Sequence, residues 1–133
     1  MGQFQAVYYR DPEGFEPVRD FVDALPVETQ VAVENQIARL NLLSDEIPHL
    51  PFPHSSQVEG ELRELRCHYG RQLYRILCRR SGRLVILLHV FAKRSAKIPA
   101  GDIDIAQQRW ADFRARMDAA HRVPPRAAGG DAP

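Results

Sequence analysis

The chain has 133 residues, of which 44% are hydrophobic and 26% are charged. This length supports one domain with a single core, and the proportions are typical of a soluble globular protein. The longest apolar run, residues 84–88, is too short to span a bilayer, and no signal segment is visible, so we expect a cytoplasmic protein with no membrane partner.

The formal net charge of +1 hides a strong separation of charge along the chain. Residues 62–97 contain ten Lys or Arg and one acid, whereas residues 1–61 contain three Arg and eleven acids. The basic segment also holds the three most strand-like runs of the sequence. A basic β-surface of this kind favours a polyanion, most often nucleic acid.

The acidic first half predicts one strand and two helices. Residues 4–9 (FQAVYY) are aromatic and β-branched, which is typical of a strand. Apolar residues at helical spacing follow Asp11-Pro12 and predict a short helix that ends before Pro26. Pro26 then opens a longer helix through about Leu43. Residues 44–60, with three prolines, are expected to form a surface loop.

The basic segment predicts an antiparallel meander of three strands, at residues 62–67, 72–79 and 83–91. A two-residue turn at residues 69–70 would place Glu64 opposite Arg75. An even second loop would align Arg75 with Leu88 and Val90, and an odd loop would align it with Leu87, His89 and Phe91. The sequence leaves this open, because a one-residue slip moves every side chain to the other face.

A basic loop at residues 92–98 leads into a final helix that begins near Pro99 and carries an apolar stripe. Residues 119–133 have few large apolar groups, so they are expected to be a flexible tail beyond a domain of residues 1–118. The predicted order is β-α-α-β-β-β-α. This order indicates an α+β fold with a single antiparallel sheet, an N-terminal helical hairpin and a C-terminal helix.

The cysteine and histidine pattern indicates no metal site. Cys67 and Cys78 fall in neighbouring predicted strands and are expected to be reduced core thiols. The five histidines are scattered without metal-ligand spacing. We expect no cofactor.

Three sequence runs carry a family resemblance. Glu61–Leu65 reads ELREL, Tyr74–Leu77 reads YRIL, and Leu87–Pro99 reads LLHVFAKRSAKIP, followed by a helix that starts with DIDIA. In this order they resemble the phage-derived branch of the RelE/HigB toxins, the toxin halves of bacterial type II toxin–antitoxin pairs. The resemblance covers roughly residues 4–117 and implies a RelE-like fold.

Three positions depart from the usual pattern of that branch. Arg94 replaces a lysine and keeps its charge, Ile98 replaces a threonine and removes a hydroxyl, and Cys78 replaces an aromatic residue. The resemblance implies an endonuclease that cuts mRNA in the ribosomal A site without a metal, by attack of the RNA 2′-hydroxyl on the adjacent phosphate. It also implies a cognate antitoxin, of the helix-turn-helix DNA-binding type, as a partner beside the ribosome and mRNA.

Metal-free RNA cleavage needs charge stabilisation at the phosphorus, a base for the 2′-hydroxyl proton and an acid for the 5′-oxygen. Arg75 is the leading candidate for the first role. It interrupts an apolar strand between Leu73 and Leu77, and the arginine fork suits phosphate oxygens. A buried ion pair with Glu64 is the alternative interpretation.

The other candidates come from the same basic segment. Histidine titrates near neutral pH, but a lone histidine on an apolar strand is more often a core residue. Lysine serves as an acid or base only where neighbouring cations ease its deprotonation. The further catalytic candidates are Arg66, Lys93, Lys97 and His89, and the RNA-binding candidates are Arg71, Arg94 and Phe91.

Two rival functions fit the same pattern. The first is a toxin of this general fold that poisons gyrase by binding protein, which would tolerate the loss of Arg75. The second is a non-catalytic module whose basic patch only docks on ribosomal RNA.

Overall fold

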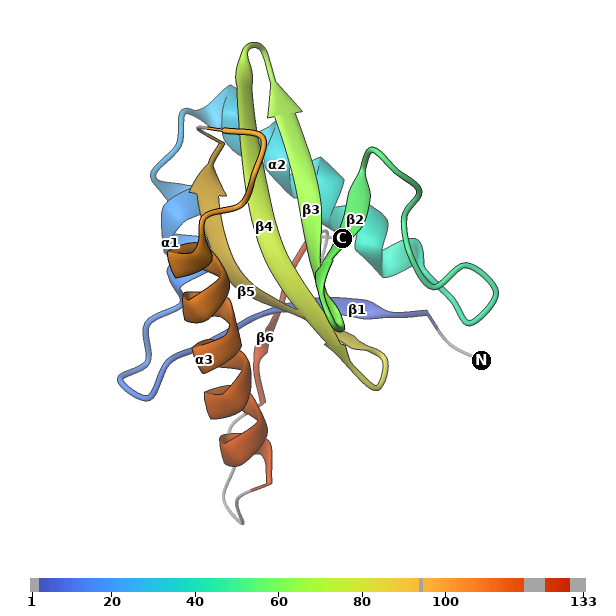
Figure 1. Cartoon of the computed structure of the whole chain (residues 1–133), viewed down its shortest axis with the longest axis vertical. Helices are drawn as coiled ribbons and strands as arrows, with labels where there is room; N and C mark the ends of the chain where they lie inside the picture. Colours follow the sequence, from blue (N-terminus) through green and yellow to red (C-terminus); the bar gives the residue numbers. More distant parts are fainter. Residues whose placement is uncertain (1–2, 94, 119–123, 130–133) are drawn as a thin grey trace.

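The computed structural model describes residues 3–93, 95–118 and 124–129. This part of the chain forms one six-stranded sheet, in the order β2-β3-β4-β5-β1-β6, covered by three α-helices (Figure 1). The strands are β1 (Gln5–Tyr8), β2 (Ser55–Glu59), β3 (Leu62–Tyr69), β4 (Gln72–Ser81), β5 (Leu84–Ala92) and β6 (Arg126–Ala127). The helices are α1 (Pro17–Asp23), α2 (Val27–Ala38) and α3 (Ala100–Met117), with a 3₁₀ turn, η1 (Arg39–Leu42), after α2. The predicted α+β class is confirmed.

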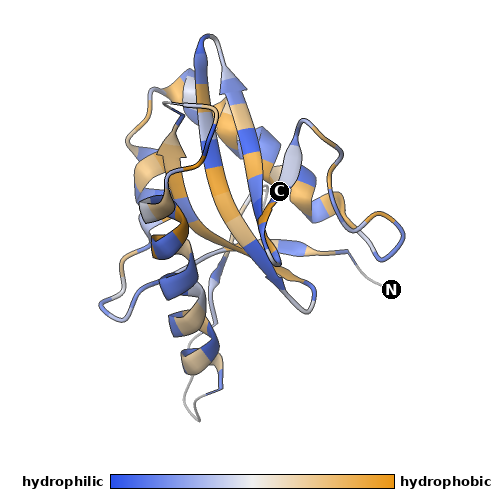
Figure 2. Ribbon diagram, in the orientation of Figure 1, coloured by the Kyte–Doolittle hydropathy of each residue, from blue (hydrophilic) through white to orange (hydrophobic). Residues whose placement is uncertain are grey.

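The sheet separates two apolar layers. In Figure 1, α3 lies on the near side of the sheet and α2 on the far side. Central strands β4 and β5 bury side chains on both faces, as their nearly continuous apolar runs predict. Hydrophobic residues concentrate on these two strands, whereas much of α3 is hydrophilic (Figure 2). The predicted stripe of α3 faces the sheet, where it contributes Ile103, Ala106, Trp110, Phe113 and Met117 to the near layer.

The prediction of a wholly antiparallel sheet is wrong at one pair of strands. β1 lies beside β5 and runs parallel to it, with Gln5 opposite Leu84. Helices α1 and α2 carry the chain away from β1, and the meander β2–β5 then returns to it across the sheet. The direction in which the last meander strand meets β1 depends on this tertiary path, which strand patterns do not record.

Two short edge strands were not predicted. β2 falls within residues 44–60, which were expected to be a loop, and pairs with β3. β6 falls within the expected flexible tail, yet it pairs with β1 and buries Ala128. Residues 119–123 and 130–133 of that tail lie outside the described residues. Both strands are short and lack an alternating pattern of large apolar side chains, so neither carries the pattern that predicts a strand.

The first helix begins later than predicted. The side chain of Asp11 accepts hydrogen bonds from the backbone N–H groups of Glu13 and Phe15. These bonds build a turn after β1, and α1 starts only at Pro17. The expected helix from Pro26 to about Leu43 is present as α2 followed by η1.

The register of the meander differs from the prediction by two residues. The first turn is at residues 70–71, so Arg66 rather than Glu64 stands opposite Arg75, and Glu64 stands opposite Leu77. Since the difference is even, each side chain stays on its predicted face.

The open question about Arg75 and the last strand is decided by a β-bulge. The second turn is even, with Ser81 opposite Leu84, and alone it would align Arg75 with Val90. Between Leu77 and Cys78 the register shifts, and Leu88 becomes an extra residue. Arg75 is therefore opposite Phe91 and shares its face with His89.

Candidate nucleic-acid interface

The α3 side of the sheet carries two rows of functional side chains. One row runs across β5, β4 and β3 and contains Phe91, Arg75 and Arg66, each opposite the next. The neighbouring row contains His89, Leu77, Glu64 and, on β2, Ser56. Strand pairing therefore brings together four of the predicted site residues, which are separated by up to 25 positions in the sequence.

Arg75 is held in a buried cluster of charge. Its Nε lies 3.3 Å from Oε1 of Glu64, and its Nη2 donates a hydrogen bond to the carbonyl of Ala96 at 3.1 Å. These two atoms are not aligned for a hydrogen bond, so the attraction between them is that of an ion pair. Oε2 of Glu64 accepts a hydrogen bond from Ser56 at 2.7 Å. Arg75 is only 3% exposed, which gives it the buried pairing that was the alternative interpretation.

Arg66 differs from Arg75 because its side chain is half-exposed on the same face. Its backbone N–H donates to the carbonyl of His54, and its own carbonyl accepts from the side chain of Gln36. Among the described residues, no carboxylate lies within ion-pair distance of its guanidinium, and Nε has no hydrogen-bond partner. In the described residues the charge of Arg66 is thus not neutralised by a carboxylate, although its Nε is shielded from solvent.

The loop after β5 places further positive charge beside this row. Lys93 and Lys97 are exposed, and the backbone N–H of Lys93 donates to the carbonyl of Leu73 at 2.7 Å. This bond fixes the start of the loop next to β4, two residues from Arg75. Arg71 is exposed in the β3–β4 turn, and Arg94 lies outside the described residues.

His89 connects β5 to α3. Its Nε2 lies 2.7 Å from Oδ1 of Asp102, and its Nδ1 faces Nη1 of Arg109 at 3.3 Å. Arginine only donates hydrogen bonds, so Nδ1 accepts and Nε2 carries the proton shared with Asp102. The ring also stacks on Phe91, with 5.6 Å between centroids. Both ring nitrogens of His89 are therefore engaged, and its ring packs against the ring of Phe91.

Sequence reasoning missed the supporting residues of this site. Ser56 lay in a predicted loop, and Asp102 and Arg109 were assigned only to a helix. The contact between His89 and Asp102 does have a sequence signal. It is a carboxylate at the start of the helix that follows a strand with a lone histidine. No sequence signal marks Ser56, because β2 itself was not recognised.

The two cysteines have no part in this face. Cys67 and Cys78 are free and buried in the layer beneath α1 and α2, which confirms the prediction of core thiols. Burial raises the pKa of each thiol to about 12.

Among the described residues, no three His, Cys, Asp or Glu side chains come close enough together to hold a metal ion. No helix there combines the length and the hydrophobicity needed to cross a membrane.

Comparison with known families matches residues 20–111 to the family described as phage derived protein Gp49-like (DUF891). The matched residues include the whole basic meander and the first part of α3, so they contain the face described above. No curated protein matches the chain. The Gp49-like family is associated with toxins of the RelE superfamily, which implies a toxin-like module and an antitoxin partner. With more than half of its residues matched, the chain belongs to the Gp49-like family of phage-derived proteins.

Proposed function

We propose that this protein is the toxin of a toxin–antitoxin pair and acts as a ribosome-dependent mRNA endonuclease of the RelE/HigB type. The observation that carries the proposal is the row Phe91, Arg75 and Arg66, which lies beside a loop that holds Lys93 and Lys97. Stacking and positive charge on one sheet face are what a single RNA strand requires.

In the proposed reaction, the 2′-oxygen of one nucleotide attacks the adjacent phosphorus. The bond from phosphorus to the 5′-oxygen breaks, and the products are a cyclic phosphate and a new 5′-hydroxyl. The proton of the 2′-hydroxyl must leave, and a proton must reach the 5′-oxygen. Negative charge grows on the phosphate oxygens, and cations placed there in advance lower the barrier.

The described geometry supports different roles for the two arginines. Arg66 is half-exposed and has no carboxylate partner among the described residues, so we assign it to the phosphate. Arg75 is buried against Glu64 and the carbonyl of Ala96, so we assign it to positioning the loop and to the local positive field. Phe91 would stack on a base, and Lys93, Lys97, Arg71 and Arg94 would bind the backbone.

No complete acid–base pair accompanies these cations in the described residues, since His89 is occupied by Asp102 and Arg109. We therefore expect little cleavage of free RNA by the pure protein. The ribosome would supply the alignment of the mRNA, and positioning of reacting groups is worth many orders of magnitude in rate.

The proposal is tested with programmed ribosomes, a defined mRNA and the pure protein. We expect cleavage by the wild type, a loss of about 100-fold or more with Arg66→Ala, and normal cleavage with Arg19→Ala. Arg19 is a matched control because it is a half-buried arginine on α1 that pairs with Asp23. Rapid cleavage of free RNA, or equal activity of wild type and Arg66→Ala, would contradict the proposal.

A second candidate is a non-catalytic module that docks on ribosomal RNA. The burial of Arg75 and the double engagement of His89 favour it. Ribosome binding without cleavage by the wild type identifies this function. Absence of both binding and cleavage points instead to a toxin that acts on a protein target such as gyrase.

A further inference from the structure

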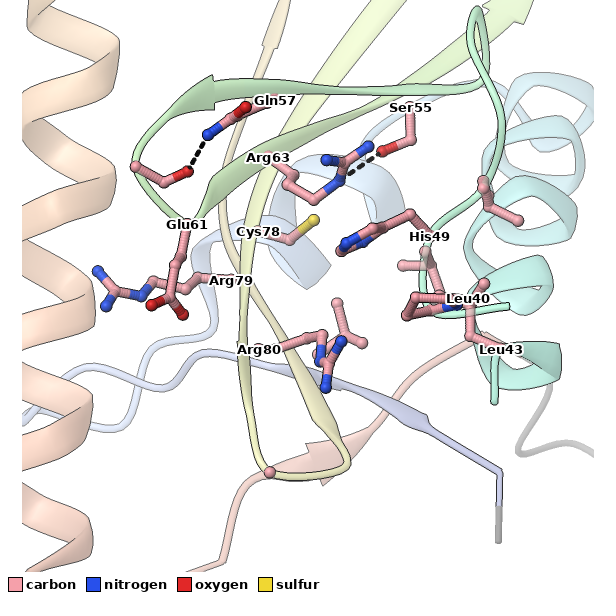
Figure 3. A pocket seen from close by; sticks show the side chains of 15 residues that line it. Leu40, Leu43, His49, Ser55, Gln57, Glu61, Arg63, Cys78, Arg79 and Arg80 are labelled. Carbon is pink, nitrogen blue, oxygen red and sulfur yellow. Dashed lines mark hydrogen bonds between the residues drawn. The ribbon is translucent and has the colours of Figure 1, made fainter. Parts of the chain in front are cut away.

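A pocket of about 480 Å³ lies on the face of the sheet opposite Arg66 and Arg75. It opens between η1, the loop that follows it, and strands β2, β3 and β4 (Figure 3). Its apolar wall belongs to the core layer under α1 and α2 and contains Leu40, Leu43, Leu50, Cys78 and Val85. The size is in the range of small-molecule pockets, about 300–1,000 Å³.

Four basic side chains line this pocket, and one of them, Arg79, is held over the ring of Trp110 at 4.4 Å from its centroid. Figure 3 shows Arg63, His49 and Arg80 on three sides of Cys78. Nε of Arg63 donates to the hydroxyl of Ser55 at 3.3 Å, and the guanidinium of Arg80 lies 4.5 Å from the ring centroid of Phe4. These contacts fix both arginines without neutralising them.

The positive charge of the pocket is not compensated by ion pairs. Within the described residues, no carboxylate lies within ion-pair distance of Arg63 or Arg80. Glu61 also lines the pocket, but in Figure 3 it lies toward Arg79 and away from His49. Burial, and then the charges of Arg63 and Arg80, lower the pKa of His49. A positive charge on His49 is therefore unfavourable in these surroundings. A bound anion would make that charge less unfavourable.

The two arginines are placed to meet on one anion. Arg63 on β3 is opposite Cys78 on β4, and Arg80 follows two residues later on the same face. Diagonal neighbours of this kind lie about 7–8 Å apart, within the combined reach of two arginine side chains. In Figure 3 the guanidinium of Arg63 lies beside Ser55 and that of Arg80 lies on the other side of His49. Rotation of these long side chains would bring both forks onto one phosphate group, which offers several oxygens.

The rest of the pocket suits a flat body attached to that phosphate. The apolar wall would cover a ring, and imidazole or guanidinium planes stack on nucleic-acid bases. We propose that this pocket binds a nucleoside monophosphate, either free or as the terminal nucleotide of an RNA strand, with Arg63 and Arg80 on its phosphate. The site is on the other face from Arg66, so it does not depend on the proposed cleavage.

The test is a titration of the ¹⁵N-labelled full chain, followed by its amide and arginine Nε–H signals. The probes are AMP, UMP, adenosine, inorganic phosphate, and a short RNA with and without a terminal phosphate. We expect AMP or UMP to saturate shifts at Ser55, Arg63, Arg80 and Val85, and to bind more tightly than phosphate or adenosine alone. Arg63→Gln and Arg80→Gln should each weaken binding about tenfold, while Arg19→Gln leaves it unchanged.

The pKa of His49 gives a second readout that a merely structural role for the arginines would not move. A bound phosphate should raise it, as followed by the imidazole signals across pH, and the rise should be absent in Arg63→Gln. If only the RNA with a terminal phosphate binds, the source of the ligand is a strand end rather than a free nucleotide.

Three outcomes would overturn the proposal. The first is no saturable shift with AMP or UMP at about 10 mM and none with the RNA that carries a terminal phosphate. The second is equal weakening by Arg19→Gln, which would mean only general electrostatic attraction. The third is that a synthetic peptide of alternating Glu and Leu shifts these signals while both nucleotides do not, because the pocket would then take an acidic protein segment.

Discussion

At the scale of single residues, the burial of Arg75 with Glu64 is the feature that most constrains the site. A charge removed from water is costly unless another charge and hydrogen bonds compensate it. Glu64, the carbonyl of Ala96 and the hydroxyl of Ser56 provide that compensation. The cluster also links three strands and the basic loop, so the positions of the exposed cations depend on it.

Removing Glu64 should therefore destabilise the whole domain. We predict that Glu64→Ala lowers the free energy of unfolding by about 3–5 kcal/mol, because Arg75 would be left buried and unpaired. Denaturant unfolding measures this. Asp45→Ala is the matched control, since it breaks the exposed pair between Asp45 and Arg83 and should change stability little. A small effect of Glu64→Ala, similar to that of the control, would show that the pair is not structurally important.

The cysteines allow a second prediction at this scale. Burial raises the pKa of both Cys67 and Cys78 to about 12, so both remain protonated thiols between pH 7 and 9. Since the thiolate is the reactive form, the native protein should react slowly with a thiol reagent at pH 8 and the denatured protein rapidly. Rapid modification of two thiols in the native protein would show that the thiols are accessible.

Much of the site was predictable residue by residue, but its geometry was not. Arg75 is conspicuous because it interrupts an apolar strand, and Phe91 and the loop lysines follow from the basic segment. The bulge at Leu88 has no sequence signal, yet it decides that Arg75 shares a face with His89 and Phe91. The partners of His89 on α3 also depend on tertiary packing.

At the scale of elements, the edge strands show how the sheet ends. β6 covers the edge of β1, and Ala128 donates its backbone N–H to the carbonyl of Ala6. Asn41 donates to the carbonyls of Ala128 and Gly129 and accepts from the N–H of Ala6. These bonds satisfy backbone groups that an open edge would leave free.

Gly129 should be essential for this docking. Its φ is +65°, and a Cβ atom there would lie 2.5 Å from Cγ2 of Ile37 and 2.8 Å from the backbone N of Ala38. We predict that Gly129→Ala lowers the free energy of unfolding by about 1–3 kcal/mol through strain and loss of the β6 contacts. Thermal unfolding measures this directly.

Gly101 supplies the control at the start of α3. A Cβ atom there meets nothing within 4 Å, and alanine is the better helix former, so Gly101→Ala should be neutral or slightly stabilising. If Gly129→Ala behaves like Gly101→Ala, the docking of residues 124–129 contributes little to stability.

Element types were more predictable than their arrangement. The apolar stripe of α3 and the three strands of the meander follow from periodicity, and all of them are present. The parallel pairing of β1 with β5 and the strands β2 and β6 do not follow, because they are set by contacts between distant segments. The first helix was predicted too early, since Asp11 caps a turn rather than a helix.

At the scale of the whole molecule, acidic and basic residues are concentrated in different segments of the chain. Residues 1–61, which include α1 and α2, carry eleven acids against three arginines, and residues 62–97 carry ten cations against one acid. A polyanion would therefore approach the basic strands and their loop rather than α1 and α2.

This charge separation predicts a strong and assignable salt dependence. Lys93→Ala and Lys97→Ala should each reduce the slope of log affinity against log salt by about 0.7 for single-stranded RNA, if each lysine contacts one phosphate. Arg19→Ala should leave the slope unchanged. Fluorescence anisotropy with a labelled RNA at several salt concentrations measures this. Identical slopes for all these proteins would exclude the loop from the RNA interface.

The most direct test of the central claim is to map the ends of an mRNA held on programmed ribosomes after incubation with the protein. We predict one cut within the A-site codon, with a cyclic phosphate on the upstream fragment and a 5′-hydroxyl on the downstream fragment. Arg66→Ala should abolish this cut, and Arg19→Ala should not. An intact mRNA on ribosomes that have bound the wild-type protein would contradict the claim.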